Sequence, residues 1–141
     1  MEPAPRPRPL PTEETRPYWE GAQQGELRIQ QCGACGRHQF YPRLLCTHCG
    51  SEQVGWVRAT GRGRIYSYTV NHRPAGPAFA SMVPYVVALV DLEEGARMMA
   101  NLLQCAPEEA LIGMEVEVVF EDIGEGMRLP QFKPAGDGAT R

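Results

Sequence analysis

Four cysteines arranged as two Cys-x-x-Cys pairs constrain this chain more than any other feature. The pairs are Cys32 with Cys35 and Cys46 with Cys49. Each pair can form a tight knuckle in which two thiolates and the following backbone amides face one point. Two knuckles joined by a hairpin supply four sulfurs in a tetrahedron, which is the coordination that structural zinc prefers. We therefore predict one structural Zn²⁺ bound by these four thiolates.

Other interpretations of the cysteines are weaker. Disulfides would need an oxidising compartment, and the Pro-rich N-terminus lacks the apolar stretch of a secretory signal. A redox dithiol normally uses one Cys-x-x-Cys, whereas iron also fits four thiolates. His38 and His48 lie near the pairs and are interpreted as solvent-facing or surrounding residues. Because four sulfurs close the coordination shell, we expect the metal to support the fold and to take no part in chemistry.

Length and charge narrow the class of protein. A chain of 141 residues, 43% of them hydrophobic, builds one ordinary domain or two very small ones. It has no apolar run of about 18 residues that could span a membrane, so we expect a cytoplasmic protein without a membrane partner. The net charge of −3 argues against general nucleic-acid affinity.

The charges are distributed unevenly along the chain. Residues 26–75 carry seven arginines against two glutamates, whereas residues 88–126 carry ten acidic residues against one arginine. This asymmetry indicates an anionic ligand or an acidic partner near the basic half. A solvated surface that happens to be lopsided explains it equally well, and the sequence leaves both interpretations open.

The chain divides into four segments, and the predicted fold class is mainly β. Residues 1–13 have proline at alternate positions, which predicts a disordered, extended arm. Residues 14–54 predict a short helix followed by a rubredoxin-like zinc ribbon. Residues 55–135 predict a five-stranded OB-fold barrel, with an open sandwich as the structural alternative. Residues 136–141 predict a disordered tail.

Hydrophobic alternation and turn residues place the individual elements. A helix is expected near 14–24, because Pro17 suits its first turn and Gly25 its end. A long strand includes Ile65, Tyr68 and Val70. The remaining predictions, in chain order, are a loop at 74–84, strands at 85–92 and 97–105, a helical turn at 106–113, and strands at 114–123 and 128–135.

Five motifs in a fixed order resemble a known family. They are CGACG…YPRLLCTHCGS, GRGRIYSYTVNHRP, PYVVALVDLEEG, IGMEVEVVFED and LPQFKPA. The resemblance runs from about residue 17 to residue 135. The family was once described only as a domain of unknown function, number thirty-five. Its members join a rubredoxin-like zinc ribbon to an OB-fold and are associated with acyl-CoA.

The resemblance implies a function that the residues alone do not reveal. Such family members bind thiolase-like enzymes or acyl-CoA hydratases. The resemblance therefore implies a non-catalytic accessory subunit of an acyl-CoA thiolase or acyltransferase complex, which aids assembly and the binding or channelling of CoA thioesters. A hetero-oligomer with two copies of each subunit is expected. Cys105 has no neighbouring histidine or basic residue, so we interpret it as a small buried hydrophobe and expect the nucleophile in the partner.

Two sets of residues are candidates for binding. Apolar anchors for the partner are expected on the helix and the ribbon, at Tyr18, Trp19, Phe40, Tyr41 and Leu44. Contacts to CoA phosphates, or to acidic groups of the partner, are expected from the basic half, at Arg43, Arg62, Arg64, His72 and Arg73. By analogy with OB-folds, the loop at 72–84 is expected to cover the acyl group.

Two other functions remain open. A single-stranded nucleic-acid module would stack bases on Tyr66 and Tyr68, which lie beside Arg62 and Arg64. An independent thioesterase or hydratase would need a catalytic constellation. No Ser-His-Asp or paired-carboxylate pattern with convincing context is present, so this alternative is the weaker of the two.

Overall fold

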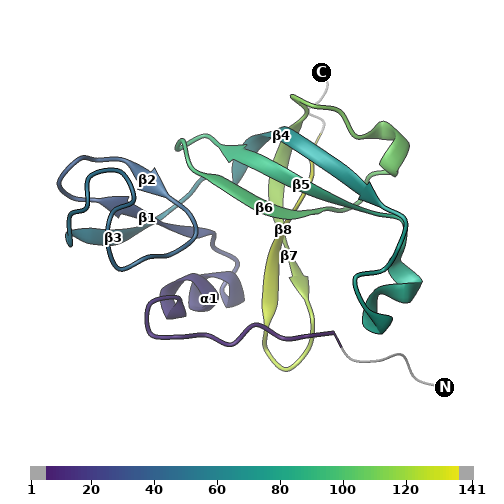
Figure 1. Cartoon of the computed structure of the whole chain (residues 1–141), viewed down its shortest axis with the longest axis horizontal. Coiled ribbons are helices and arrows are strands. Elements are labelled where there is room, and N and C mark those ends of the chain that lie inside the picture. The colour runs from purple at the N-terminus through teal and green to yellow at the C-terminus, as the bar shows by residue number, and fades with distance from the viewer. Residues whose placement is uncertain (1–5, 137–141) are drawn as a thin grey trace.

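The computed structural model describes residues 6–136, and the predictions for residues 1–5 and 137–141 lie outside them. A helix and a small ribbon lie on one side of the molecule, and a barrel lies on the other (Figure 1). This arrangement confirms the predicted mainly β fold class. Within residues 6–136, no helix has the length and apolar character needed to cross a membrane.

The N-terminal helix and the ribbon follow the sequence pattern closely. Helix α1 (Arg16–Gln23) begins with a proline in its first turn and is followed by Gly25 at a φ of 80°. The ribbon sheet has the order β2-β1-β3 with antiparallel pairing. Its strands are β1 (Arg28–Cys32), β2 (His38–Gln39) and β3 (Val54–Arg58). Strand β1 is the middle strand of this sheet and ends at Cys32, the first of the four cysteines.

Five strands close into a barrel of order β4-β5-β6-β8-β7. Strands β6 and β8 pair in parallel, and the other neighbours are antiparallel. The strands are β4 (Arg62–Asn71), β5 (Tyr85–Leu92), β6 (Arg97–Leu102), β7 (Glu115–Asp122) and β8 (Arg128–Pro134). This closed topology is that of an OB-fold and excludes the open sandwich.

In the barrel strands, buried side chains that face the core alternate with side chains that face outward. In β5, every second residue from Val86 to Leu92 is buried. Strand β4 has a bulge between Ile65 and Ser67, after which Tyr68 and Val70 pack against the core. The same core includes Tyr18, Leu27 and Ile29 from the helix and the ribbon. Ribbon and barrel therefore form one packed unit.

The connecting segments differ from the sequence prediction in two details. The predicted loop at 74–84 contains the 3₁₀ helix η1 (Pro77–Met82), and the Phe79 and Tyr85 ring centroids lie 6.2 Å apart. Strand β6 ends at Leu102, earlier than predicted, because the chain turns at Gln104, whose φ is 57°. The helical turn predicted at 106–113 is present as η2 (Pro107–Glu109).

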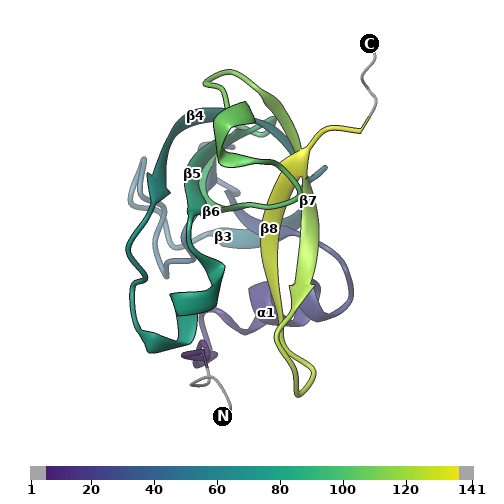
Figure 2. The ribbon, with the colours of Figure 1, turned by 90° about the vertical axis from the view of Figure 1, so that its right-hand side faces the viewer.

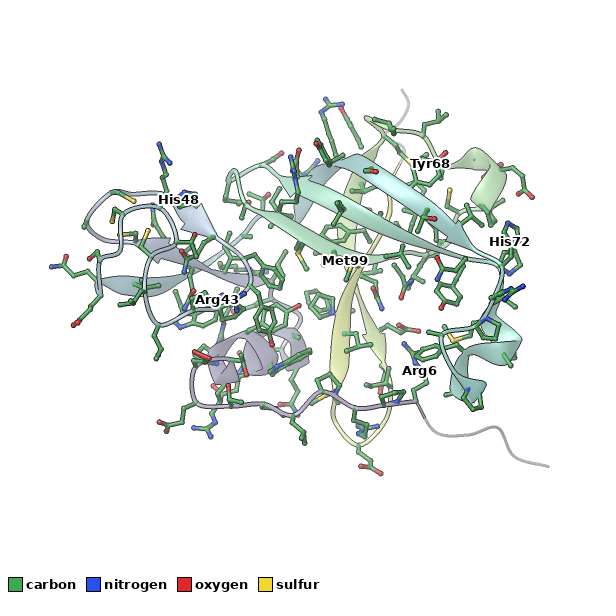
Figure 3. The ribbon with its side chains drawn as sticks, in the orientation of Figure 1. Arg6, Arg43, His48, Tyr68, His72 and Met99 are labelled. Atoms are coloured by element: carbon green, nitrogen blue, oxygen red, sulfur yellow. The ribbon has the colours of Figure 1, made fainter. Side chains whose placement is uncertain are left out.

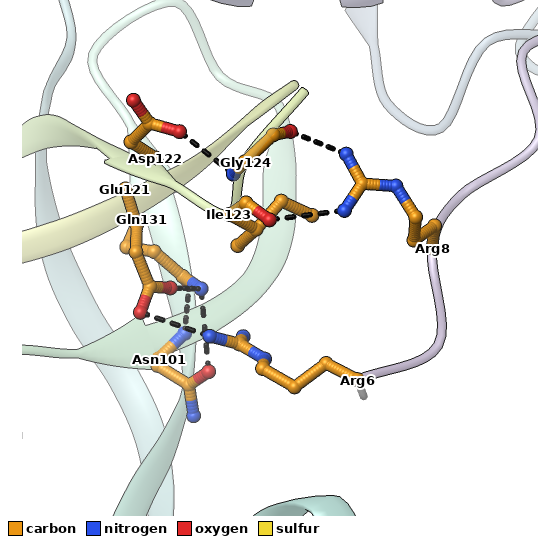
Figure 4. Close-up of polar contacts among 8 residues, drawn as sticks. All are labelled: Arg6, Arg8, Asn101, Glu121, Asp122, Ile123, Gly124 and Gln131. Carbon is orange, nitrogen blue, oxygen red and sulfur yellow. Dashed lines mark hydrogen bonds and ion pairs between the residues drawn. The ribbon is translucent and has the colours of Figure 1, made fainter. Parts of the chain in front are cut away.

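Side-chain amides complete the seam where β6 meets β8. Only Leu102 and Phe132 are in register across this seam. The side chain of Gln131, which is 4% exposed, accepts a hydrogen bond from the Asn101 backbone amide at 2.7 Å and donates one to Asn101 Oδ1 at 3.3 Å (Figure 4). Asn101 Nδ2 in turn donates to the Val86 carbonyl at 3.0 Å. The polar groups of the seam are thus satisfied by one another.

Residues 6–13, part of the segment expected to be disordered, run past the tip of the β7–β8 hairpin (Figures 1 and 2). Arg6 and Arg8 both contact this hairpin. We call residues 6–11 the arm.

Candidate functional site

The two cysteine pairs form two matching knuckles. In each knuckle a glycine amide donates to the carbonyl of the first cysteine at 2.9 Å, Gly36 to Cys32 and Gly50 to Cys46. These glycines have φ values of 79° and 80°, in the left-handed region that glycine adopts at low cost. The chain therefore turns tightly enough for the second cysteine of each pair to face the first.

The four sulfurs converge on one point. All four Sγ atoms lie within 4.8 Å of one another. Cys32 Sγ lies 3.6 Å from Cys49 Sγ, and Cys35 Sγ lies 3.7 Å from Cys46 Sγ. A tetrahedral zinc with Zn–S bonds of ~2.3 Å would separate its sulfurs by ~3.8 Å. The four cysteines are thus positioned to bind a metal, and the spacing of their donors fits a tetrahedral ion.

Backbone amides favour ionised sulfur at the first cysteine of each knuckle. The Cys35 and Ala34 amides donate to Cys32 Sγ and lower the pKa of Cys32 to about 6, the Cys35 amide contributing most. At Cys46, burial raises the pKa, but hydrogen bonds from the amides of Cys49 and His48, together with those from the Cys35 and Cys49 thiols, outweigh it and lower the pKa overall.

Cys49 shows the opposite shift. The Ser51 amide acts to lower its pKa, but the Cys32 thiol, then burial and the two other thiols, raise the pKa of Cys49 to about 11. A cation that replaces the protons on the sulfurs would remove this conflict.

The two histidines are outside the sulfur cluster. His48 Nδ1 lies 3.3 Å from Arg37 Nη1, which can only donate, so Nδ1 accepts. His48 Nε2 then carries the proton and donates to the His38 carbonyl at 3.3 Å. These contacts use both ring nitrogens of His48, in agreement with its interpretation as a surrounding residue and not a ligand.

The predicted aromatic anchors pack into one cluster beside the ribbon. Tyr18 has ring centroids 4.7 Å from Trp19, 5.3 Å from Phe40 and 6.3 Å from Tyr41. Tyr18 is only 4% exposed and forms the inside of the cluster. Trp19 and Phe40 are half-buried, and Tyr41 is 40% exposed. The helix residue Tyr18 therefore lies on the buried side of the aromatic cluster, and the ribbon residue Tyr41 lies on its exposed side.

The exposed part of this surface is apolar and compact in sequence. Tyr41, Leu44 and Leu45 form what we call the ribbon-loop patch, with the two leucines 73% and 49% exposed. Arg43 lies within the same loop, its guanidinium carbon 5.7 Å from the centre of the Tyr41 ring (Figure 3). Leu45 was not among the predicted anchors. The adjacent leucines between Pro42 and Cys46 were the signal that could have identified it.

Two buried glutamines fix the backbone of the ribbon-loop patch. Gln30 accepts from the Arg43 amide at 2.8 Å and donates to the Arg43 carbonyl at 2.9 Å. Gln39 donates to Gln30 Oε1 and to the Leu45 carbonyl, at 2.8 and 3.2 Å, and accepts from the Thr47 amide at 2.7 Å. Buried, satisfied amides of this kind rigidify a loop. Polar residues at inward positions of β1 and β2 were the sequence signal for them.

The five predicted basic residues lie in three separate places. Arg62 and Arg64 line an open hollow of about 360 Å³ on the barrel, together with Asp91, Glu93 and Glu115. Arg64 pairs with Glu115 at 2.7 Å. Arg43 lies beside the ribbon, whereas His72 lies at the far end of the barrel, followed by the exposed Arg73 (Figure 3). The structure does not bring the five side chains together.

The tyrosines expected of a nucleic-acid module are engaged within the protein. The guanidinium carbon of Arg97 lies 3.5 Å from the centre of the Tyr66 ring. Tyr68 is half-buried and donates its hydroxyl to the Ala110 carbonyl at 3.0 Å. Base stacking needs an exposed aromatic face. Tyr68 does not offer one, whereas Tyr66 is 50% exposed but carries Arg97 over one face of its ring.

Cys105 has the environment of an unreactive thiol. It is half-buried, and burial, reinforced by Glu109, raises its pKa. Its Sγ lies 3.4 Å from the Ala106 carbonyl, to which it donates. A nucleophilic thiolate needs a lowered pKa and a neighbouring base.

Two family models match the chain in tandem. Residues 19–55 match the rubredoxin-like zinc ribbon domain of ChsH2, and residues 56–121 match the C-terminal OB-fold domain of ChsH2. A solved structure described as an Ltp2-ChsH2(DUF35) aldolase is 42% identical with a TM-score of 0.81, and the match covers 91% of this chain and 99% of that one.

Curated relatives carry several functional names. A probable enoyl-CoA hydratase alpha subunit from Thermomonospora curvata is 43% identical over 92% of this chain and 40% of its own length. A DUF35 domain-containing scaffold protein from Methanothermobacter thermautotrophicus is 37% identical over 81% of this chain and 86% of its length. A benzoylsuccinyl-CoA thiolase subunit, BbsA, from Geobacter metallireducens is 35% identical over 54% and 49%. The chain thus spans about two fifths of the first relative's length.

Proposed function

Because the chain belongs to the DUF35 family of zinc-ribbon and OB-fold proteins, we propose that it is a non-catalytic accessory subunit of an acyl-CoA enzyme complex. The observation that carries this proposal is the ribbon-loop patch, an exposed apolar surface whose backbone is held by two buried glutamines. A rigid apolar anchor costs little ordering entropy when a partner covers it. The acyl-CoA setting comes from the names of the relatives.

We propose a thiolase-like enzyme as the catalytic partner, which would supply the nucleophile and the base. The thiolase subunit name of one relative supports this assignment. Within residues 6–136, the one cysteine outside the four-sulfur cluster has a raised pKa, so this part of the chain offers no activated thiolate outside that cluster. Two copies of each subunit are the expected stoichiometry.

The ion in the four-cysteine site is proposed to be zinc. The four thiolates would hold it, and a zinc bound by four sulfurs supplies structural stability and no open position for substrate. The ribbon-loop patch lies between the second strand of the ribbon and Cys46. The ion would therefore fix one end of the loop that carries the patch.

Arg43 is the basic residue best placed to act with the patch. It lies in the same loop, whereas Arg62 and Arg64 share their hollow with three acidic residues. We propose that Arg43 pairs with an acidic group of the partner or with a CoA phosphate at the subunit boundary. Arg62, Arg64, His72 and Arg73 are retained as proposed phosphate contacts of secondary importance.

Titration of a purified thiolase-like partner with this chain and with matched variants of it tests this proposal. The variant Leu44→Glu places a charge at the centre of the patch and should weaken binding by about tenfold or more. Leu111→Glu is the control, because Leu111 is also exposed, at 64%, but lies in the loop between β6 and β7. Calorimetry would give both affinities, and metal content would confirm that both ribbons are intact.

Equal binding by Leu44→Glu and the unchanged chain would contradict the proposed docking surface. A partner that is fully stable and active without this chain would contradict the accessory role.

A hydratase partner is the second candidate, because one relative is named as an enoyl-CoA hydratase alpha subunit. The same titration with a hydratase-like partner separates the two candidates. The preferred partner is the one whose activity depends on this chain.

A further inference from the structure

The β7–β8 hairpin is acidic and meets a basic part of the same chain. Its strands and turn carry Glu121, Asp122 and Glu125 close to the tip. The arm brings Arg6 and Arg8 to this tip from more than a hundred positions away in sequence (Figure 4). Prolines on both sides of each arginine keep the arm extended, which lowers the entropy lost when it docks. This contact lies outside the ribbon and outside the surfaces used in the proposed function.

Arg8 forms hydrogen bonds with the turn of the hairpin. Its Nη1 donates to the Ile123 carbonyl at 2.9 Å, and its Nη2 donates to the Gly124 carbonyl. Its Nε lies 3.9 Å from Glu125 Oε1. The guanidinium fork thus contacts two consecutive carbonyls and a carboxylate, a geometry that lysine could not reproduce.

Arg6 connects the hairpin to the loop between β4 and β5. Its Nη1 donates to Glu121 Oε2 at 3.1 Å, and its guanidinium carbon lies 5.5 Å from the centre of the Phe79 ring in η1. The side chains of Arg6 and Glu121 are each only 24% exposed, so this pair is screened less than a fully exposed one. One arginine therefore touches both the β7–β8 hairpin and η1.

The contacts of Arg6 continue into the barrel seam. Glu121 Oε1 accepts from Gln131 Nε2 at 3.0 Å, and Gln131 bonds Asn101 on β6. Asn101 shares the outer face of β6 with Met99, which is 65% exposed. The arm thus lies at the rim of an outer sheet face that includes an exposed apolar side chain.

From these contacts we propose that the arm is a displaceable strap, which ties η1 to the β7–β8 hairpin. The strap is held by polar and charged contacts that water and salt compete for, so it can open without unfolding the barrel. This inference does not depend on the proposed function.

Hydrogen exchange of the full chain tests the strap. The arm itself is a poor reporter, because its prolines have no amide hydrogen. The reporters are the amides of the hairpin turn, where Ile123 donates to Met127 and Met127 donates to Gly124, and the Phe79 amide of η1. In the double variant Arg6→Ala, Arg8→Ala, exchange at both reporters should rise by about two- to five-fold. In 1 M NaCl, the difference between the variant and the unchanged chain should shrink.

Two further variants make the test specific. Arg58→Ala removes an equally charged residue that lies on the ribbon strand β3 and pairs with Glu26, and it should leave both reporters unchanged. Glu121→Gln keeps an acceptor for Gln131 but removes the charge that Arg6 meets. As a single substitution, Glu121→Gln should raise hydrogen exchange at both reporters. Added to Arg6→Ala, it should have little further effect.

Three results would overturn the proposal. The first is unchanged exchange at both reporters in the double variant. The second is an equal rise in Arg58→Ala, which would show a general charge effect. The third is faster exchange in the hairpin with no change in η1, which would mean that the arm clamps the hairpin without bridging the two segments.

Discussion

Individual side chains decide which parts of the candidate site are exposed. Tyr18 was predicted as an anchor for a partner, but it is 4% exposed and supports the aromatic cluster from inside. Burial, with a smaller contribution from Tyr41, raises the pKa of the Tyr18 phenol well above its usual value. The neutral phenol is therefore the form that the folded protein accepts.

The buried phenol predicts a loss of stability at alkaline pH. Above the unfolded tyrosine pKa of ~10, the unfolded chain loses the Tyr18 proton while the folded chain keeps it. The unfolded state then binds fewer protons than the folded state, so the free energy of unfolding falls as pH rises. Tyr18→Phe should remove this part of the slope. Urea unfolding between pH 9 and 11 measures it, and identical slopes for both proteins would contradict the prediction.

Pairing of strands places the arginines of β4 beside acidic residues of distant strands. The basic residues of β4 and the acidic residues of β5 and β7 are far apart along the chain. Antiparallel pairing places Arg64 opposite both Asp91 and Glu115. Opposite charges therefore lie side by side on the sheet. A count of charges along a sequence cannot reveal this, because it contains no information on register.

Local patterns predicted the elements well, whereas contacts over long sequence separations could not be predicted. The alternation in β5 and the cysteine spacing are short-range signals, and both led to the correct structure. The seam bond between Gln131 and Asn101 and the contact of Arg6 with Glu121 depend on how distant segments meet. Nothing near these residues in the sequence indicates their partners.

A glycine in β4, where this strand pairs with β5, offers a test of strand packing. A Cβ atom at Gly63 would lie 2.5 Å from the Asp91 carbonyl oxygen, which is backbone and cannot move aside easily. Gly63→Ala should therefore lower the free energy of unfolding by ~1–3 kcal/mol. Gly76→Ala is the matched control, since nothing lies within 4 Å of its added Cβ and its φ of −176° suits any residue. Chemical unfolding of both variants would decide, and equal stabilities would contradict the predicted clash.

At the scale of the whole molecule, the ribbon and the barrel are joined by one core. Leu27 and Ile29 of the ribbon side are 2% and 0% exposed and belong to the same cluster as Phe132 of the last barrel strand. Loss of order in the ribbon would uncover part of the barrel core. The stability of the barrel is therefore linked to the sulfur cluster.

Removing one sulfur should weaken the entire molecule. Cys46→Ser replaces a buried member of the four-sulfur cluster and should abolish tight metal binding. A loss of ~3 kcal/mol would lower the melting temperature by roughly 10 °C for a chain of this size. Cys105→Ser is the control outside the cluster. Metal analysis and calorimetry measure both effects, and a metal-free Cys46→Ser protein with an unchanged melting temperature would contradict the link.

The order of segments along the chain has a consequence for how the molecule is made. Both knuckles precede every barrel strand, and β8, which completes the closed sheet, follows all the others. During translation, the four thiols therefore leave the ribosome well before the barrel can shut. All four donors of the proposed ion are therefore present in the nascent chain before any barrel strand has been added, so binding of the ion would not have to wait for the barrel to close.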